Sequence, residues 1–274
     1  MKQYILFLLI PVVISAQGNS DLDIKAKANS DGTIVKAKFI LKNPMITLEQ
    51  AKHSKIEVNF ISHVTATVEN NIVLDISTSP YLSRNPIIKY KFKDLNQSND
   101  INYILTDNKG KQKEHFSEIK RKHNLSREKK QLRHSNTSVV NFRKTNPLAW
   151  TASNSKEAIK ELYGLVENPI KNKINLLMPE DSNPRESDCG LKVPVKFSSK
   201  IDLESLAIFI DNIEGSTVAV ISIPPFSIID YELRVKIRGE QYTLIIIGKD
   251  REGRFYKATH KGHLPSSYDA CLWT

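Results

Sequence analysis

The chain has 274 residues, 40% of them hydrophobic, and its 40 basic and 30 acidic side chains give a formal net charge of +10. This length predicts roughly two domains, and the apolar content is sufficient for true hydrophobic cores. The positive charge raises the question of nucleic-acid binding, but its distribution and the expected export of the chain argue against that class of partner.

The N-terminus has the outline of a secretory signal peptide. A short basic start, Met1-Lys2-Gln3, precedes an apolar run over 4–14, and Ser15-Ala16 offers small residues for cleavage. The apolar run is too short to favour a membrane-spanning helix. We expect residues 1–18 to be removed and the mature protein to be periplasmic, without a membrane span. Ile14 is not the usual small residue for its position, so the cleavage site stays open.

Residues 21–119 are expected to form an all-β, immunoglobulin-like sandwich. Short runs of alternating polar and apolar residues are separated by turn signals such as Asp107-Asn108-Lys109-Gly110. Six or seven strands without a convincing helix suit this architecture. The loops 42–58 and 79–86 lack a nucleophile–base pair, and we interpret His63 as a polar residue at a strand edge because no second metal ligand lies at motif spacing.

Residues 120–152 are expected to be a flexible basic linker. Nine basic side chains oppose only Glu118 and Glu128 between residues 117 and 150, so we assign most of the excess charge to this connector and not to the folded parts. A solvated linker is the preferred interpretation, and attraction to an anionic partner is the alternative. Nucleic acid is disfavoured because no aromatic stacking residues accompany the charges.

Residues 153–274 are expected to form a second sandwich that begins with one short helix. Ser153-Asn154-Ser155 provides an N-cap, and Gly164 can end the helix. Seven strand-like segments follow between residues 174 and 259. Pro194 lies inside one of them, which predicts an edge position or a local irregularity. The complete prediction is two immunoglobulin-like sandwiches joined by a basic linker.

Cys271 lies three residues before the last residue, where a thiol is not placed to pack a core. A thiolate near a chain end can react with sulfur electrophiles and form S–S bonds. The alternative is a structural disulfide with Cys189, the only other cysteine. In a seven-strand sandwich the two flanking strand ends lie at the same end, so both readings stay open. A third reading uses His260, His263 and Cys271 as metal ligands, and we rank it last.

Part of the first half resembles SoxZ, a component of the thiosulfate-oxidation (Sox) sulfur carrier. The resemblance is carried by Asn43-Pro44-Met45, by Phe60-Ile61-Ser62-His63-Val64, and by the stretch from Ser83-Arg84-Asn85-Pro86 to Lys93. It covers roughly residues 21–120 and implies a domain that packs on a carrier subunit and offers a docking surface.

The second half resembles SoxY, the carrier subunit, over roughly residues 153–274. The helix, Leu191-Lys192-Val193-Pro194-Val195, the strand that begins at Ile201 and Gly253-Arg254-Phe255-Tyr256 carry this resemblance. In that family a C-terminal cysteine between glycines holds sulfur intermediates covalently, and Cys271 falls close to that position. Here Asp269-Ala270 and Leu272-Trp273 replace the glycines, so the tip is bulkier.

The resemblance implies a carrier protein without a catalytic site, cofactor or metal of its own. Cys271 would be the sulfur-carrying residue. The partners would be Sox-type enzymes, namely a c-type cytochrome, a hydrolase and a sulfur dehydrogenase, and a homodimer stays open. The second hypothesis is an exported binding or adaptor protein in which the Cys189–Cys271 disulfide is structural.

Overall fold

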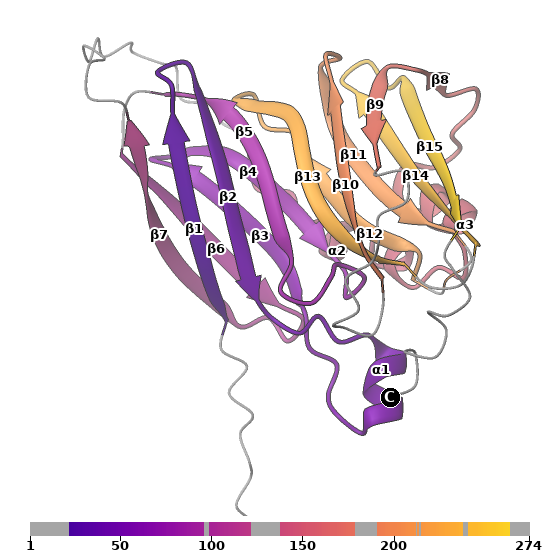
Figure 1. The fold of residues 1–274 in the computed structure, drawn as a ribbon. Coiled ribbons are helices and arrows are strands. Elements are labelled where there is room, and N and C mark those ends of the chain that lie inside the picture. The colour runs from indigo at the N-terminus through magenta and orange to yellow at the C-terminus, as the bar shows by residue number, and fades with distance from the viewer. Residues whose placement is uncertain are drawn as a thin grey trace, which may run out of the picture.

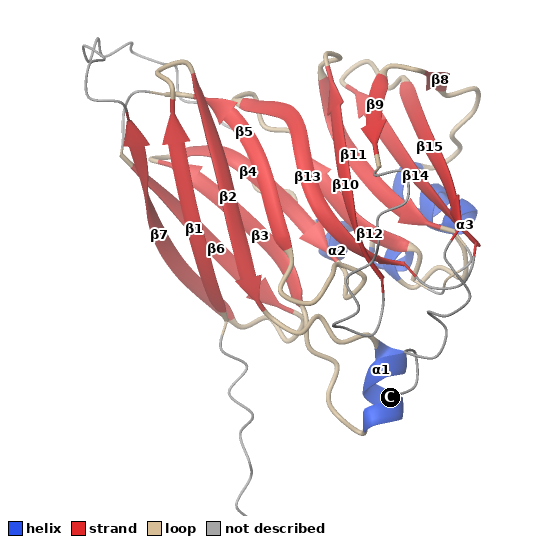
Figure 2. Ribbon diagram, in the orientation of Figure 1, coloured by secondary structure: helices blue, strands red, loops and turns tan. Residues whose placement is uncertain are grey.

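The protein is almost entirely built from β-strands, as the computed structural model shows (Figure 2). The structure describes residues 22–95, 99–121, 138–178, 191–211, 213, 215–237 and 241–263. The expected all-β class is therefore confirmed. The signal peptide, Cys189 and Cys271 lie outside the described residues.

The first half contributes seven strands and one helix. They are β1 (Asp23–Ser30), β2 (Ile34–Lys42), α1 (Leu48–Ser54), β3 (Ile61–Val68), β4 (Asn71–Thr78), β5 (Ile87–Lys93), β6 (Asp100–Asp107) and β7 (Gln112–Arg121). Alternating side chains bury the inner face of most of these strands, as the sequence pattern predicts. Helix α1 was not expected. Its N-terminus is fixed by a capping box, in which the Thr47 side chain and the Gln50 side chain each accept the other residue's backbone N–H.

The second half contributes three helical segments and eight strands. They are α2 (Phe142–Thr145), the 3-10 helix η1 (Pro147–Trp150), α3 (Ser155–Tyr163), β8 (Ile170–Lys171), β9 (Ile174–Leu177), β10 (Leu191–Ser199), β11 (Leu203–Ile210), β12 (Thr217–Ser222), β13 (Ser227–Ile237), β14 (Gln241–Asp250) and β15 (Phe255–His263). The expected helix is confirmed as α3, with Asn154 as its N-cap and Gly164 (φ +75°) at its end. Pro194 pairs with Arg234 of β13, but β9 pairs with β10 only from Lys196 onward, so the proline lies beyond the partner on its other side.

The strands of the two halves pair with one another along two seams. At one seam β5 pairs antiparallel with β13, and at the other β4 pairs antiparallel with β12. The two sandwiches therefore share two continuous sheets (Figure 1). We call the layer β1-β2-β5-β13-β10-β9 sheet A and the layer β7-β6-β3-β4-β12-β11-β14-β15-β8 sheet B. A parallel contact between β1 and β7 joins the two layers at the outer edge of the first sandwich.

The apolar core lies between the two sheets and runs across both seams. One cluster of buried side chains includes Phe39 and Val64 of the first half together with Phe197 and Ile221 of the second. Burial of such a core is the main stabilising contribution to a fold of this size. Because the core and both sheets are shared, the two halves pair within one chain.

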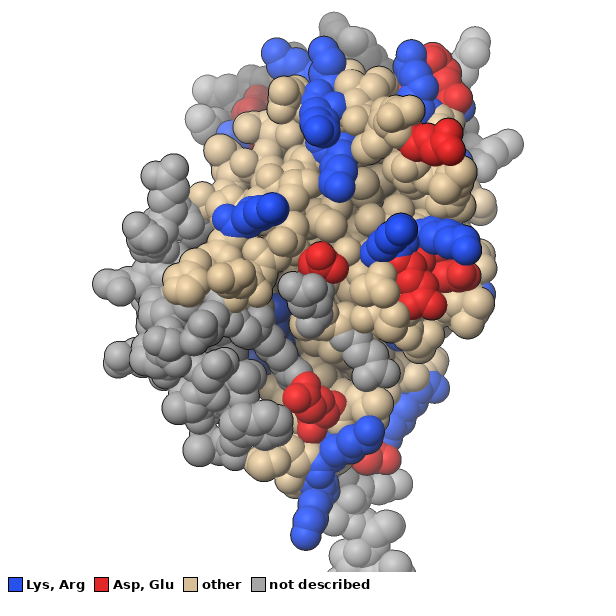
Figure 3. Space-filling view, turned by 90° about the vertical axis from the view of Figure 1, so that its right-hand side faces the viewer, with Lys and Arg blue, Asp and Glu red and all other residues tan. Residues whose placement is uncertain are grey.

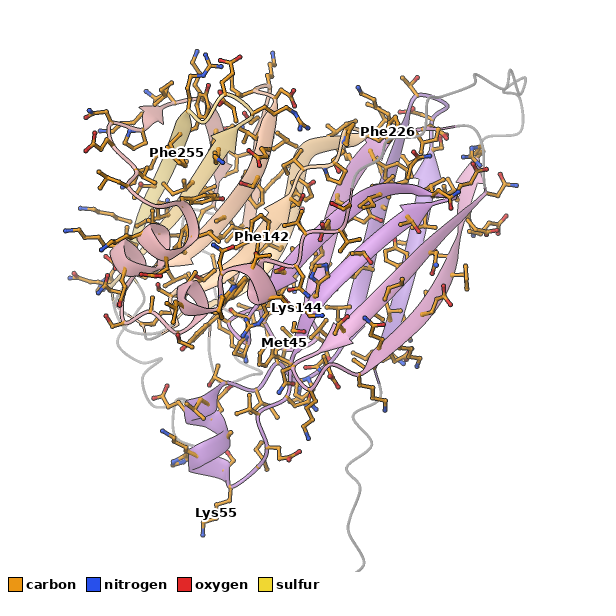
Figure 4. The ribbon with its side chains drawn as sticks, turned by 180° about the vertical axis from the view of Figure 1, so that it is seen from behind. Met45, Lys55, Phe142, Lys144, Phe226 and Phe255 are labelled. Atoms are coloured by element: carbon orange, nitrogen blue, oxygen red, sulfur yellow. The ribbon has the colours of Figure 1, made fainter. Side chains whose placement is uncertain are left out.

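The end of the expected linker is an ordered strap and not a tether. Residues 138–152, which we call the strap, run over the outer face of sheet B, and Ala149 and Trp150 are buried there. Figure 4 shows Phe142 and Lys144 on this side of the molecule. The basic composition of this segment suggested a flexible linker. Burial of Trp150 and the neighbouring apolar side chains instead stabilises an ordered conformation. Residues 122–137 of the expected linker lie outside the described residues. None of the helices in the described ranges is long and apolar enough to cross a bilayer.

Candidate functional site: the end of the second sandwich next to the two cysteines

Cys189 precedes β10 in the sequence, and Cys271 follows β15. The start of β10 and the end of β15 lie at the same end of the second sandwich. Leu191 at the start of β10 pairs with Ile237 at the end of β13. His263 at the end of β15 pairs with Gln241 at the start of β14, only four residues further along the chain than Ile237. The sequence argument that both anchoring strand ends lie together is therefore confirmed.

The chain lengths to the two thiols keep both sequence hypotheses open. Cys189 lies two residues before Leu191, and Cys271 lies eight residues after His263. Eight extended residues span at most roughly 28 Å, which exceeds the spacing of about 10 Å between packed sheets. The tail is thus long enough to reach Cys189 or to extend away from the sandwich.

Two loops of the first half converge on this end. The proline-bracketed loop 79–86 pairs with β13, because Ser83 N donates to Arg234 O (3.0 Å) and Lys236 N donates to Tyr81 O (2.7 Å). The loop that carries Met45 precedes α1, and Figure 4 shows Met45 above that helix. Met45 is fully buried, and its N–H donates to Asn43 Oδ1 at 2.7 Å. Sequence analysis assigned these loops no role, because they lack a nucleophile–base pair, and the structure makes them part of this end.

Lys236 is a buried lysine at the junction of these loops with β13. Its side-chain ammonium donates to the Met45 carbonyl and to Gln50 Oε1 (3.2 Å), so it ties the 43–50 loop and α1 to the second half. Burial lowers the pKa of Lys236 to about 7, and the nearby charges of Lys192 and Arg84 act in the same direction. Sequence analysis missed this residue. The alternating pattern of β13 places it on the outer face, and only the cover by the 43–50 loop buries it.

The last strand before the tail is held by a close contact between Tyr242 and Gly262. These residues pair across β14 and β15, and the tyrosine ring lies over the glycine. A Cβ at position 262 would meet the Cζ atom of Tyr242 at 2.2 Å. A side chain at position 262 would have to displace the ring, so glycine lets the tyrosine cover the end of β15.

The two histidines of the metal hypothesis do not form a ligand pair. His260 and His263 lie in β15 three residues apart, and successive side chains of a strand alternate between its faces. The two imidazoles therefore project from opposite faces. The spacing that suggested a metal site has this meaning only in a helix or a loop, and the third hypothesis loses its basis.

His63 is part of a buried Ser–His–Asp cluster on the outer face of sheet B. Its Nε2 lies 2.9 Å from Asp75 Oδ1, and its Nδ1 lies 3.4 Å from Ser77 Oγ. All three side chains are buried, with exposures of 4% for His63, 1% for Asp75 and 0% for Ser77.

The strap closes this cluster from outside. Val140 N donates to Asp75 Oδ2 (2.7 Å), and Phe142 N donates to Ser77 Oγ (3.1 Å). A serine that is covered and accepts a backbone hydrogen bond has no access to a substrate, so the cluster holds the strap and is not a catalytic triad. The expectation that His63 is structural agrees with this arrangement, although the residue is buried and not at a strand edge.

Comparison with known proteins finds a family match within the first half. Residues 24–117 match the family described as sulphur oxidation protein SoxZ. No curated protein matches the chain significantly. The SoxZ resemblance expected from the sequence is therefore confirmed, and the segment that contains both converging loops lies within the region that matches SoxZ.

Two solved structures illustrate what else the chain is similar to. The sulfur carrier protein SoxY from Chlorobium limicola f thiosulfatophilum is 21% identical, with a TM-score of 0.34, and the alignment covers 40% of this chain and 94% of that one. Fibronectin(III)-like modules of CbhA from Clostridium thermocellum are 10% identical, with a TM-score of 0.23, and the alignment covers 88% of this chain and 94% of the other.

Proposed function

We propose that this chain is an exported, fused sulfur carrier of the Sox type that presents the Cys271 thiol to partner enzymes in thiosulfate oxidation. The observation that carries the proposal is the SoxZ match over residues 24–117, joined through two continuous sheets to a second sandwich that is followed by a near-terminal cysteine. In this proposal the second half takes the SoxY role, and the protein acts as a carrier and not as an enzyme.

The chemistry assigned to Cys271 is the oxidative coupling of its thiolate to thiosulfate. One S–S bond forms between Cys271 Sγ and the outer sulfur of thiosulfate, and two electrons leave for a c-type cytochrome partner. A hydrolase would then add water to the terminal sulfonate, release sulfate and two protons, and leave a persulfide on the cysteine. A sulfur dehydrogenase would oxidise that remaining sulfur. The chain itself supplies the thiol and the docking surfaces.

The convergence of the SoxZ-type loops supports this role. The loops 43–50 and 79–86 meet β13 at the same end of the second sandwich from which the tail to Cys271 continues. A partner that engages the tail would thus meet residues of both halves, which is a reason for keeping them on one chain.

Intact-mass analysis of the oxidised chain tests the proposal. The mature protein is incubated with thiosulfate and a Sox-type cytochrome, and an adduct of one thiosulfate on Cys271 is expected. Cys271→Ser should lose the adduct, whereas the matched Cys189→Ser variant should keep it. Equal labelling of both variants, or no thiosulfate-dependent mass change in the wild-type chain, would contradict the proposal.

The second candidate function is an exported adaptor in which Cys189 and Cys271 form a structural disulfide. The common end of β10 and β15 favours it, because both anchors lie on the same side of the sandwich. A peptide map under non-reducing conditions distinguishes the two. A fully formed Cys189–Cys271 bond that survives mild reductant, together with unchanged partner binding in Cys271→Ser, supports the adaptor.

A further inference from the structure

The outer face of sheet A carries rows of lysines that cross from the first half into the second. The strand register places Lys27 opposite Lys38, Lys38 opposite Lys89, and Lys89 opposite Glu232, which in turn is opposite Lys196. These five residues lie on β1, β2, β5, β13 and β10, which are side by side in Figure 1. The row is thus spread over five neighbouring strands, each about 4.8 Å from the next.

A second, shorter row runs beside the first. Lys36 of β2 lies opposite Lys91 of β5, and Asn29 of β1 continues the row on the other side. Like charges directly opposite each other on neighbouring strands are destabilising. Three such pairs, Lys27–Lys38, Lys38–Lys89 and Lys36–Lys91, therefore weaken the isolated protein, and an anionic surface laid against them would remove that repulsion.

The rows enclose a shallow hollow of about 330 Å³. Its lining includes six lysines and two carboxylates, namely Lys27, Lys36, Lys38, Lys89, Lys91, Lys196, Asp230 and Glu232. Both carboxylates are held by lysines, since Lys89 Nζ lies 2.6 Å from Glu232 Oε1 and Lys91 pairs with Asp230. None of the four remaining lysines forms an ion pair with another described residue, and the hollow has a clear positive excess.

This charge lies on the folded sheets, in addition to the net excess that the sequence places between residues 117 and 150. The count over residues 117–150 was correct, but it concealed how the strand register concentrates lysines on one face. Other parts of the surface mix both signs, as the side seen in Figure 3 shows, where blue and red groups neighbour each other. The positive excess on sheet A is a local property of its outer face.

The chemistry of the lysine face, which we define as these eight lining residues, favours a protein partner. Among the exposed large apolar side chains of the described ranges, only Leu177 of β9, opposite Lys196, borders the face, and a single leucine is a weak anchor for insertion into lipid. It also presents no exposed aromatic ring for base stacking. The two carboxylates add a pattern of sign that an acidic protein surface can match more closely than a uniform polyanion can.

We propose that the lysine face of sheet A is a docking surface for an acidic patch on a partner protein. The face spans the β5–β13 seam, so one partner contacts both halves at once. The proposal does not depend on the redox state of Cys271 and goes beyond the carrier function. Electrostatic attraction of this kind raises association rates and weakens steeply with salt.

Binding of a fluorescein-labelled oligoglutamate peptide, measured by anisotropy over a salt series, tests the proposal. The face variant Lys27→Gln/Lys38→Gln/Lys196→Gln should bind about tenfold more weakly than the wild-type chain at low salt, since each lost exposed pair contributes up to about 1 kcal/mol. The matched control Lys144→Gln/Lys156→Gln/Lys160→Gln removes the same charge from the opposite side, where all three lysines are exposed. It should bind as the wild type does.

Two further measurements separate the outcomes. Zero-length carbodiimide cross-linking of the bound peptide should place its links on Lys27, Lys38, Lys89 or Lys196. Equal weakening in both variants, or links mainly on the strap and α3, would overturn the proposal.

The second measurement is binding of the chain to vesicles of phosphatidylserine and phosphatidylcholine. Binding to these vesicles that the face variant abolishes, without binding of oligoglutamate, would replace the protein partner by a lipid surface.

Discussion

The outer faces of the two shared sheets differ, because that of sheet B is covered by other segments and that of sheet A is exposed. The outer face of sheet B is covered over its central strands by the strap and α3, and its polar side chains Asp75 and Ser77 are hydrogen-bonded to strap backbone. The outer face of sheet A keeps exposed lysines opposite one another across hydrogen-bonded strands. A covered face can therefore hold the β4–β12 seam together, whereas an open, like-charged face is available for encounters with other molecules.

Arg143 shows how the covered face accommodates even a cation. Its guanidinium lies 4.9 Å from the ring centre of Phe60 and 4.5 Å from that of Trp150, and Nη1 donates to Thr78 O at 3.0 Å. Burial lowers the pKa of Arg143 to about 10, so it stays charged at neutral pH. The same type of charge that repels its neighbours on sheet A is compensated by aromatic rings and a carbonyl on sheet B.

Removal of the Trp150 ring should have the largest effect on this contrast. Trp150→Ala deletes the buried anchor of the strap, whose Nε1 donates to Phe142 O at 3.2 Å, and should lower the free energy of unfolding by about 3–5 kcal/mol. Urea denaturation measures the loss. Leu148→Ala in the same 3-10 helix is the control, because Leu148 is 62% exposed and should cost far less. Equal losses would show that the strap is not held by its tryptophan.

Removal of the Asp75 carboxylate should have the next largest effect. Asp75→Ala leaves the Val140 N–H and His63 Nε2 without their buried partner, and we expect a loss of about 1–3 kcal/mol. Hydrogen exchange should then rise at Val140 and Phe142. Asp202→Ala is the matched control, since its side chain is 81% exposed and pairs with Arg251 only at 3.4 Å. Unchanged exchange at the strap would contradict the role of the cluster.

Lys236 should give stability a distinct pH dependence. Its pKa is about 7 in the folded chain against 10.5 for an ordinary lysine, so the unfolded chain binds more protons between these values and stability rises with pH across that window. Below pH 7 the full cost of the buried charge is present. Lys236→Met should abolish this rise, and the two stability curves should diverge by about 1–2 kcal/mol between pH 7 and 9. Parallel curves from urea titrations would refute the assignment.

A charge reversal on the open face should have the smallest effect and the opposite sign. Lys38→Glu turns two like-charge pairs, with Lys27 and with Lys89, into attractive ones and should stabilise the fold by about 0.5–1 kcal/mol. A higher thermal midpoint with weaker oligoglutamate binding is expected. Lys113→Glu, which lies opposite the apolar Leu105, should change the midpoint less. A destabilised Lys38→Glu variant would show that the lysine rows are not under repulsion.

Much of the fold follows from local patterns, and most of what was missed depends on distant partners. The alternation of polar and apolar residues in β1, β2 and β5 predicted these strands. The T-x-x-Q capping box of α1 was present in the sequence and could have been found. The pairing of Asp75 with Val140 could not, because no local pattern shows which segment will cover a strand 65 residues away.

The candidate site was predictable to a similar degree. Strand parity alone brought the segments next to Cys189 and Cys271 to one end of the second sandwich, and the register confirms it. The burial of Lys236 was hidden, since it results from Met45 and Gln50, which lie almost two hundred residues earlier. The lysine rows could be predicted only in part. The sequence shows the charges, but only the strand register places them opposite one another.

The two continuous sheets also have a consequence for whether the two halves can be produced as separate polypeptides. Either half produced alone would leave bare strand edges, β4 and β5 on one piece and β12 and β13 on the other, and such edges invite aggregation. Synthesis as one polypeptide supplies the complementary edges in equal number and at high local concentration. Every copy of the second half is thereby made together with the strands of the first half that complete its two sheets.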